Sequence, residues 1–220
     1  MVPPILIALA AANAVYYLVA QCYRGPSLPK SVSKTMSTSL LAVAALALDA
    51  PPLLAVALAL GAAGDLALSR DGETAFLTGL MAFALAHVAY IVLFVATGGA
   101  DPGVLQTGWR MNAALGLLAF GGAMGRLLWP ASGVLRWSVM GYLAIILTMG
   151  LAALATPPQA LAIAPATALA GAALFILSDA VLSAELFLLP KRHPLRRVAP
   201  FVIWSSYWAA QYLLLRGFTP

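Results

Sequence analysis

Long apolar stretches follow one another along the chain, separated by short polar connections. A helix needs about 20 apolar residues to cross the hydrocarbon core of a bilayer. Stretches that meet this need lie at about residues 3–22, 33–49, 52–69, 74–96, 110–128, 134–155, 161–188 and 198–216. Glycine and proline pairs, which interrupt helices, fall between them. The pattern predicts an all-α polytopic membrane protein, a bundle of about eight transmembrane helices.

The composition supports a membrane location. Of the 220 residues, 63% are hydrophobic and 9% are charged, whereas a soluble domain carries about 25% charged residues. Because every connection is short, we expect residues 1–220 to form a single transmembrane domain. The net charge is +5, but no basic stripe with interleaved aromatic residues is present, so we expect no nucleic-acid partner. The single Cys22 excludes an intrachain disulfide and a cysteine-based metal site.

The basic residues predict the orientation in the membrane. Of the 12 Lys and Arg residues, ten lie in alternate connections: Arg24, Lys30, Lys34, Arg70, Arg126, Arg136, Lys191, Arg192, Arg196 and Arg197. The other side holds Arg110 and Arg216. Basic residues favour the cytoplasmic side of a membrane. We therefore expect an integral protein of a bacterial cytoplasmic (inner) membrane, with both termini extracytoplasmic.

Two aspartates interrupt apolar spans in matching contexts, Gly64-Asp65-Leu66-Ala67-Leu68-Ser69 and Ser178-Asp179-Ala180-Val181-Leu182-Ser183. A carboxylate at the centre of a membrane helix costs at least about 2.5 kcal/mol, so such residues usually face a polar interior and mark function. At about 1.5 Å per residue, Asp65 lies about 8 Å along its helix from Arg70, and Asp179 about 18 Å from Lys191. Asp179 is thus the deeper of two candidate acid–base groups.

Other polar side chains fall inside the predicted spans. They are Asn13, Lys34, His87, Tyr90, Ser178, Tyr207 and Gln211. Polar groups in a membrane face one another rather than hydrocarbon, so we expect spans 1, 2, 3, 4, 7 and 8 to share a polar cavity that opens toward the cytoplasm. Taken one by one, His87 could equally be a packing residue, Lys34 a membrane-surface anchor, and Tyr207 and Gln211 interhelical links. Spans 5 and 6 carry few polar residues and are predicted to be scaffold.

A faint internal repeat runs through these residues. The span with Asp65 and the span with Asp179 are each followed by a basic connection and then by a span with two polar side chains, His87 and Tyr90 or Tyr207 and Gln211. This order is compatible with two four-helix halves in parallel repeat.

The order and spacing of these residues resemble a known family. The segments concerned are Gly64-Asp65-x-x-Leu68, Phe76-x-x-Gly79, His87-x-x-Tyr90, Ser178-Asp179 and Tyr207-x-x-Ala210-Gln211. From about residue 30 to 216 the chain is similar to the lysoplasmalogenase family, the YhhN-type integral membrane proteins. The region around Lys34 also resembles that family's second span, although Thr35 stands where the family usually has proline.

The resemblance implies a hydrolase that cleaves the vinyl ether bond of lysoplasmalogens to a fatty aldehyde and a glycerophosphoethanolamine or glycerophosphocholine. It implies no metal or organic cofactor. The substrate would be a lysophospholipid of the cytoplasmic leaflet. Protonation of a vinyl ether gives an oxocarbenium ion, and glycosidases handle such an ion with two carboxyl groups in different surroundings. By this analogy Asp179 is expected to be the general acid and Asp65 the carboxylate.

The remaining residues receive roles from the same resemblance. Lys34 becomes a candidate partner of the substrate phosphate. The others would bind or orient substrate and water: Asn13, His87, Tyr90, Ser178, Tyr207 and Gln211.

Other functions stay open at this point. Paired membrane carboxylates also serve ion- or proton-coupled transporters, which would be expected to show broken helices near the middle of the membrane and inverted halves. An intramembrane aspartyl protease fits poorly, because Gly61 and Gly64 have the wrong spacing around Asp65. A non-catalytic protein could use both carboxylates only to join helices.

Overall fold

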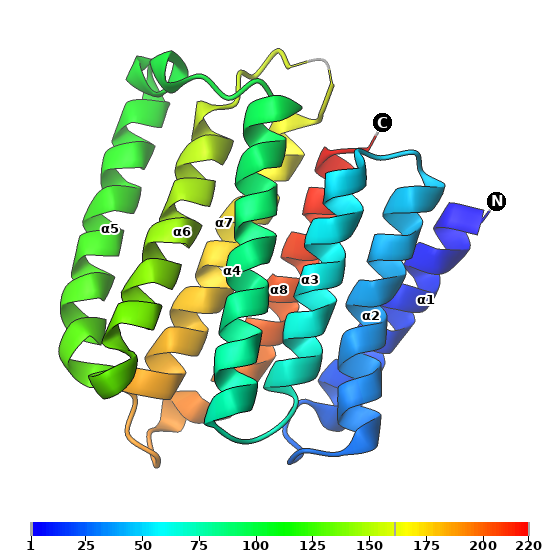
Figure 1. The fold of residues 1–220 in the computed structure, drawn as a ribbon, viewed down its shortest axis with the longest axis vertical. Coiled ribbons are helices and arrows are strands. Elements are labelled where there is room, and N and C mark those ends of the chain that lie inside the picture. Colours follow the sequence, from blue (N-terminus) through cyan, green and yellow to red (C-terminus); the bar gives the residue numbers. More distant parts are fainter. Residues whose placement is uncertain (1, 161, 220) are drawn as a thin grey trace.

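The computed structural model describes residues 2–160 and 162–219, which form eight α-helices arranged side by side (Figure 1). They are α1 (Val2–Tyr16), α2 (Leu28–Ala47), α3 (Pro52–Leu68), α4 (Glu73–Ala96), α5 (Trp109–Ala131), α6 (Arg136–Ala155), α7 (Pro165–Ser183) and α8 (Ala199–Gly217). Short π-helical turns extend α1 over Tyr17–Gln21 and α7 over Ala184–Leu188. Three 3₁₀ turns lie in connections, at Pro102–Gln106, Gly133–Leu135 and Pro194–Arg197.

The eight predicted spans are confirmed as eight helices. The second helix begins earlier than the predicted residue 33, because the Ser27 side chain caps it by accepting a hydrogen bond from the Lys30 N–H at 3.3 Å. Proline in the first turn, where no backbone N–H is needed, also favours the starts of α2, α3, α7 and α8. Helix α7 begins at Pro165, and the predicted start of its span at residue 161 lies outside the described residues.

Five of these segments are long and apolar enough to cross a membrane: Val2–Gln21, Glu73–Ala96, Trp109–Ala131, Gly133–Ala155 and Pro165–Leu188. Large apolar side chains such as Leu115 and Leu118 point outward from α5, where lipid would cover them. The protein is an integral membrane helical bundle. Helix α3 is apolar but shorter.

The helices contact one another in a closed circuit. Helices α2, α3 and α4 are successive neighbours, α4 packs on α6, α6 on α7, α7 on α8, and α8 returns to α2. Helix α1 packs against α2, and α5 against α6, so both lie outside the circuit. In two parallel four-helix halves, α1–α4 would correspond to α5–α8, and the contact of α4 with α6 would have a counterpart in a contact of α8 with α2. Both contacts are present.

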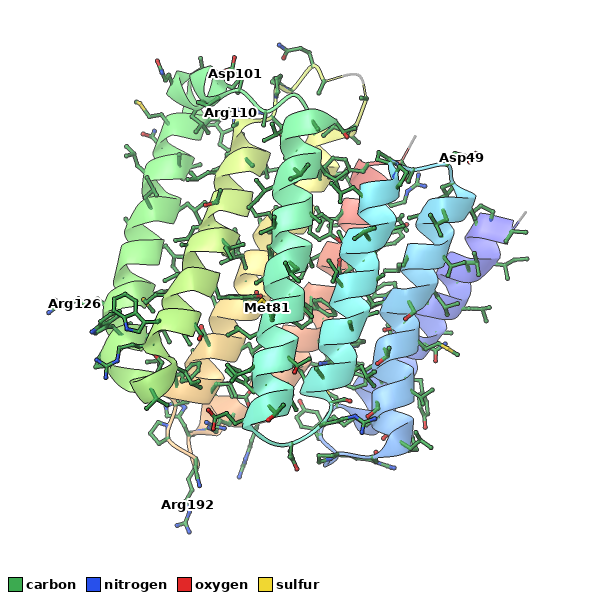
Figure 2. The ribbon with its side chains drawn as sticks, viewed as in Figure 1. Asp49, Met81, Asp101, Arg110, Arg126 and Arg192 are labelled. Carbon is green, nitrogen blue, oxygen red and sulfur yellow. The ribbon has the colours of Figure 1, made fainter. Side chains whose placement is uncertain are left out.

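Both described ends of the chain lie at one end of the bundle, the upper end in Figure 1. Asp49, Asp101 and Arg110 lie at this end, whereas Arg126 and Arg192 lie at the other (Figure 2). The alternate connections that carry ten of the basic residues thus share one end of the molecule, as the sequence predicted.

Candidate active site

A polar cavity of about 390 Å³ opens among the helices of the circuit. Its lining comes from α2, α3, α4, α7 and α8, with Tyr17 and Cys22 from the end of the first helical segment. These are the six spans that the sequence predicted to share a cavity. Lys30, Arg70 and Glu185 lie on its wall at the end of the bundle with the basic connections. Asp65 and Asp179 both line it, so the two carboxylates predicted to meet do share one cavity.

Asp65 is surrounded by groups that suit a negative charge. Its side chain is only 1% exposed. Its Oδ2 accepts hydrogen bonds from Thr38 Oγ1 and from the Tyr207 hydroxyl, both at 2.8 Å. Its Oδ1 lies 3.4 Å from Lys34 Nζ. Hydrogen bonds and a nearby cation offset the cost of burying a carboxylate, so this site is built for the ionised form.

Lys34 is therefore not the isolated phosphate anchor that the sequence suggested. Its ammonium group pairs with Asp65 and lies 5.9 Å from the centroid of the Trp204 ring, where a cation is attracted to the aromatic face. The side chain keeps 14% exposure and lines the cavity, so it also remains accessible to a ligand.

Asp179 has different neighbours. The Tyr142 hydroxyl on α6 donates a hydrogen bond to its Oδ2, and no other side chain in the described residues hydrogen-bonds to this carboxyl group. No Lys or Arg pairs with it in that part of the chain; the nearest basic atom is His87 Nε2, 3.9 Å from Oδ2. The side chain is 15% exposed and faces the cavity. Asp179 therefore has less support for a full negative charge than Asp65.

His87 on α4 is completely buried, and one of its ring nitrogens is fixed. Nδ1 lies 2.6 Å from the Phe83 carbonyl oxygen, which can only accept a hydrogen bond, so Nδ1 carries a proton. Nε2 has no hydrogen-bond partner and is directed toward Asp179. In the neutral imidazole this nitrogen is a free acceptor beside the carboxyl group.

A chain of hydrogen bonds links α4, α8 and α3. The Tyr90 hydroxyl donates to Gln211 Oε1 at 2.6 Å, Gln211 Nε2 donates to the Tyr207 oxygen at 3.2 Å, and Tyr207 donates to Asp65. All of these side chains are buried. Tyr90 and Gln211 thus act behind Tyr207 and fix its hydroxyl, rather than lining the cavity.

A second, apolar pocket adjoins the polar cavity at Asp179. Helices α4, α5, α6 and α7 form its walls, with Met124 of α5 and Leu143 of α6 among the lining residues. Six residues line both spaces: Leu68, Phe76, Phe83, Asp179, Leu182 and Leu186. Asp179 therefore lies where a polar space and an apolar one meet.

A comparison with models of known families matches residues 30–218 to the YhhN family. The chain belongs to the YhhN family. Neither the curated proteins nor the solved structures contain a match to it. The matched region holds both aspartates and every residue that hydrogen-bonds to them. It confirms the resemblance drawn from the order of the motifs.

Asn13 lies outside the part of the chain that matches the YhhN family and does not join the cavity. Its side-chain amide donates to the Leu9 carbonyl one turn earlier in α1, so its polarity is satisfied within its own helix. Tyr17, one turn further on, does line the cavity. The structure therefore gives Asn13 no contact with the cavity that would support the predicted role in binding substrate. Ser178 lines the cavity, but its hydroxyl donates to the Ile203 carbonyl and joins α7 to α8.

Tyr142 and Thr38 are site residues that the prediction did not include. Thr38 lies one turn after Lys34, and that spacing places both on one face of a helix. Tyr142 lies in a span predicted to be scaffold, and its contact with Asp179 corrects that prediction. Within the described residues, no group of three or more His, Cys, Asp or Glu side chains could hold a metal ion.

Proposed function

We propose that this YhhN protein hydrolyses the vinyl ether bond of a lysoplasmalogen, with Asp179 as general acid and Asp65 as the carboxylate that stabilises the cation. The observation that carries the proposal is the pair of unequal aspartates on one cavity, at its junction with an apolar pocket. An amphiphile with its reacting bond between a polar head and a chain matches such a junction.

The reaction begins with a proton transfer from Asp179 to the β-carbon of the vinyl ether. The C=C bond becomes a C–C single bond, and the positive charge is shared by the α-carbon and the ether oxygen. Water then adds to the α-carbon, and its proton returns to the Asp179 carboxylate, which gives a hemiacetal. The hemiacetal hydroxyl then gives up its proton as its C=O bond forms, the C–O bond to the glycerol oxygen breaks, and that oxygen takes up a proton. An aldehyde and the glycerophospho-alcohol are released, with one water consumed.

The surroundings of Asp179 suit the acid. A protonated carboxyl group can donate from one oxygen while its other oxygen accepts from the Tyr142 hydroxyl. No Lys or Arg among the described residues pairs with Asp179. The protonated, neutral form of Asp179 is therefore more favourable than that of Asp65. His87 Nε2 lies close enough to favour a fixed orientation of the group. A positioned acid contributes about 10²–10⁴-fold to such reactions.

The surroundings of Asp65 suit the anion. Two hydroxyl donors and Lys34 keep the carboxylate charged in a buried site. A fixed negative charge in low-dielectric surroundings stabilises a developing oxocarbenium ion without reorganising. Such a carboxylate can also orient the water that captures the cation.

The head of the substrate would lie toward the mouth of the cavity. Lys30 and Arg70 line this part and offer cations to a phosphate, and Lys34 lies between them and Asp65 as a third. If the basic end faces the cytoplasm, the lysolipid comes from the inner leaflet. The glycerol oxygens then lie near Lys34 and the vinyl ether near Asp179.

The decisive experiment is a turnover assay with the purified protein. It should release fatty aldehyde from 1-alkenyl lysophosphoethanolamine or lysophosphocholine in detergent, and no aldehyde from the 1-alkyl analogue, which has no double bond to protonate. A cooperative thermal transition shows that the purified protein is folded. If such a preparation releases no aldehyde from either substrate, the proposal is wrong.

The same assay separates hydrolysis from transport. A coupled transporter is expected to have broken helices near the binding site, whereas α3, α7 and α8 run without interruption through Asp65, Asp179 and Tyr207. A transporter would move substrate in vesicles and leave the vinyl ether intact.

A further inference from the structure

We propose that the apolar pocket between α4, α5, α6 and α7 binds the aliphatic chain of the substrate and sets its preferred length. This inference rests on the proposed function and extends it, because it gives α5 and α6 a role in recognition. The chain would begin at Asp179 and lie along the inner faces of these two helices.

The lining of the pocket suits a hydrocarbon chain. Phe120, Met124 and Leu128 follow one another at four-residue intervals on α5, so they form one stripe along that helix, which runs from the buried Leu128 to Phe120, 38% exposed at the edge of the pocket. Leu143 and Leu147 of α6 oppose them. Apart from Asp179, Tyr142 and Ser183, every residue of the lining is apolar. A ligand held there would gain from burying methylene groups rather than from hydrogen bonds.

The deep end of the pocket is closed by tight helix packing. A Cβ atom added at Gly150 would lie 2.7 Å from Ile176 Cδ1 and 2.8 Å from Leu117 Cδ2. Leu147 likewise fills the space over Gly121. Leu147 and Ile176 both line the pocket. Because only glycine fits against these side chains, the helices approach closely there, and the lining of the pocket ends at Phe120, Leu147 and Ile176.

The arrangement selects an unbranched amphiphile over other apolar ligands. The pocket meets the polar cavity at Asp179, and the cavity carries Lys30, Lys34 and Arg70. The same cavity also carries Asp71 and Glu185, so its lining offers charges of both signs. A molecule that occupies both spaces needs a polar head, a short linker and a single chain. A lysolipid has this shape, whereas a neutral hydrocarbon would leave the charged groups of the cavity without a partner.

The test compares alkenyl lysolipids of long and short chain in the purified protein. Met124→Trp fills the pocket from α5, and we expect kcat/KM for a hexadecenyl substrate to fall at least about tenfold, because displacing two methylenes from apolar surroundings has about that effect. A hexenyl substrate should lose less of its kcat/KM, because a short chain occupies less of the pocket. Leu143→Trp, from the facing helix, should give the same pattern.

Met111→Trp is the matched control, because it makes the same change on the exposed face of α5, where Met111 is 49% exposed. It should leave both substrates unchanged. Equal losses for both chain lengths in Met124→Trp and Leu143→Trp, or no loss in either, would overturn the chain pocket while the hydrolase function stands.

A binding measurement makes the two proposals separable. Thermal stabilisation of the protein by hexadecyl and hexyl 1-alkyl lysophosphocholine needs no turnover. If the wild type releases no aldehyde but is stabilised more by the long analogue, and Met124→Trp removes this difference, the pocket is supported and the reaction is wrong. Equal stabilisation by both analogues in the wild type overturns the pocket.

Discussion

Asp65 and Asp179 carry the same side chain among unlike neighbours. Asp65 on α3 accepts hydrogen bonds from Thr38 of α2 and Tyr207 of α8 and pairs with Lys34 of α2. Asp179 on α7 accepts a hydrogen bond from Tyr142 of α6 and faces His87 of α4. Two carboxyl groups whose surroundings differ in this way can hold different protonation states at one pH, which is what acid–base chemistry on a vinyl ether requires.

Asp179→Asn tests the assignment of the acid. Asn keeps the size of the side chain and still accepts the Tyr142 hydrogen bond, but it cannot deliver a proton. Aldehyde release should fall about 10²–10⁴-fold or more, with little change in melting temperature or in binding of the 1-alkyl analogue. Asp65→Asn should also be severe, because the cation loses its counter-charge.

Asp49→Asn provides the control for both changes. Asp49 lies in the α2–α3 connection with a φ of 51°, a conformation that Asn adopts readily. Its aldehyde release should match the wild type. Near-wild-type turnover in Asp179→Asn would contradict the two-aspartate mechanism and make His87 the next candidate acid.

Tyr142→Phe tests whether Tyr142 positions the acid. The change removes the hydroxyl that donates to Asp179 and keeps the ring, so we expect kcat to fall about tenfold, in line with the loss of a hydrogen bond worth about 1.5 kcal/mol to an ionisable group. KM should stay close to the wild-type value. Tyr212→Phe is the control, because Tyr212 stacks on Trp208 with ring centroids 5.9 Å apart and is not among the residues that line the cavity. A change in KM alone would indicate a role in the chain pocket only.

Lys34→Met should lower kcat as well as weaken substrate binding. A pure phosphate contact acts equally in the ground state and the transition state and changes only KM, which is the outcome expected for Lys30→Met at the cavity mouth. Lys34, however, also pairs with Asp65, and its removal leaves a buried carboxylate without its cation. Steady-state kinetics of both variants measure the difference, and an unchanged kcat in Lys34→Met would assign it to the phosphate alone.

At the scale of helices, the apolar pattern was enough to predict where each one runs. It could not predict which face of a helix points inward, because most spans are apolar all around. Asp65 and Asp179 were found because carboxylates are rare in such segments. Tyr142 was missed because a tyrosine in a membrane helix is ordinary, and only the packing of α6 between α4 and α7 brings it to Asp179. Asn13 was expected at the cavity because sequence spacing does not show that its amide donates a hydrogen bond within α1.

The two halves of the bundle repeat the site as well as the helices. Asp65 is contacted from the preceding helix α2 and from α8, and Asp179 from the preceding helix α6 and from α4. If α1–α4 are matched with α5–α8, then α3 corresponds to α7, α2 to α6 and α8 to α4. The helices that contact Asp65 thus correspond to those that contact Asp179. The two half-sites differ in two ways: Asp65 accepts two hydroxyl hydrogen bonds and Asp179 one, and Lys34 has no basic counterpart beside Asp179 among the described residues. Under the proposed mechanism, these differences favour the anion at Asp65 and the acid at Asp179.

The pairing of α7 with α8 depends on Gly171. A Cβ atom there would lie 3.0 Å from the Leu214 backbone nitrogen and 3.1 Å from the Ala210 carbonyl oxygen, and backbone atoms cannot move aside as a side chain can. Gly171→Ala should therefore destabilise the protein by about 1–3 kcal/mol, the usual effect of overpacking. The melting temperature in detergent measures it.

Gly116→Ala is the matched control on α5, where an added Cβ meets nothing within 4 Å. Alanine favours a helix over glycine by about 0.5–1 kcal/mol, so this variant should melt at the wild-type temperature or slightly above. Equal melting of the two variants would show that α7 and α8 do not need the close approach at Gly171.

At the scale of the whole molecule, the charge distribution and the position of the cavity indicate the same orientation in the membrane. The basic connections lie at the end of the bundle opposite the described ends of the chain (Figures 1 and 2). The cavity mouth lies at the same end, because Lys30 is in the first turn of α2 and Arg70 is in the α3–α4 connection. A lysolipid could therefore enter from the leaflet on the basic side. This is also the side that positive charges keep in the cytoplasm.

This arrangement predicts that both termini are extracytoplasmic. Alkaline phosphatase, which folds only outside the cytoplasm, should be active when fused after Pro220 and inactive when fused after Arg192, in the α7–α8 connection. A fluorescent protein that matures only in the cytoplasm should give the opposite pattern at the same two positions. Because ten of the 12 basic residues favour this orientation, active phosphatase after Arg192 together with fluorescence after Pro220 would mean that the bundle is inverted. The cavity mouth would then face the outer leaflet, and the lysolipid would have to come from that side.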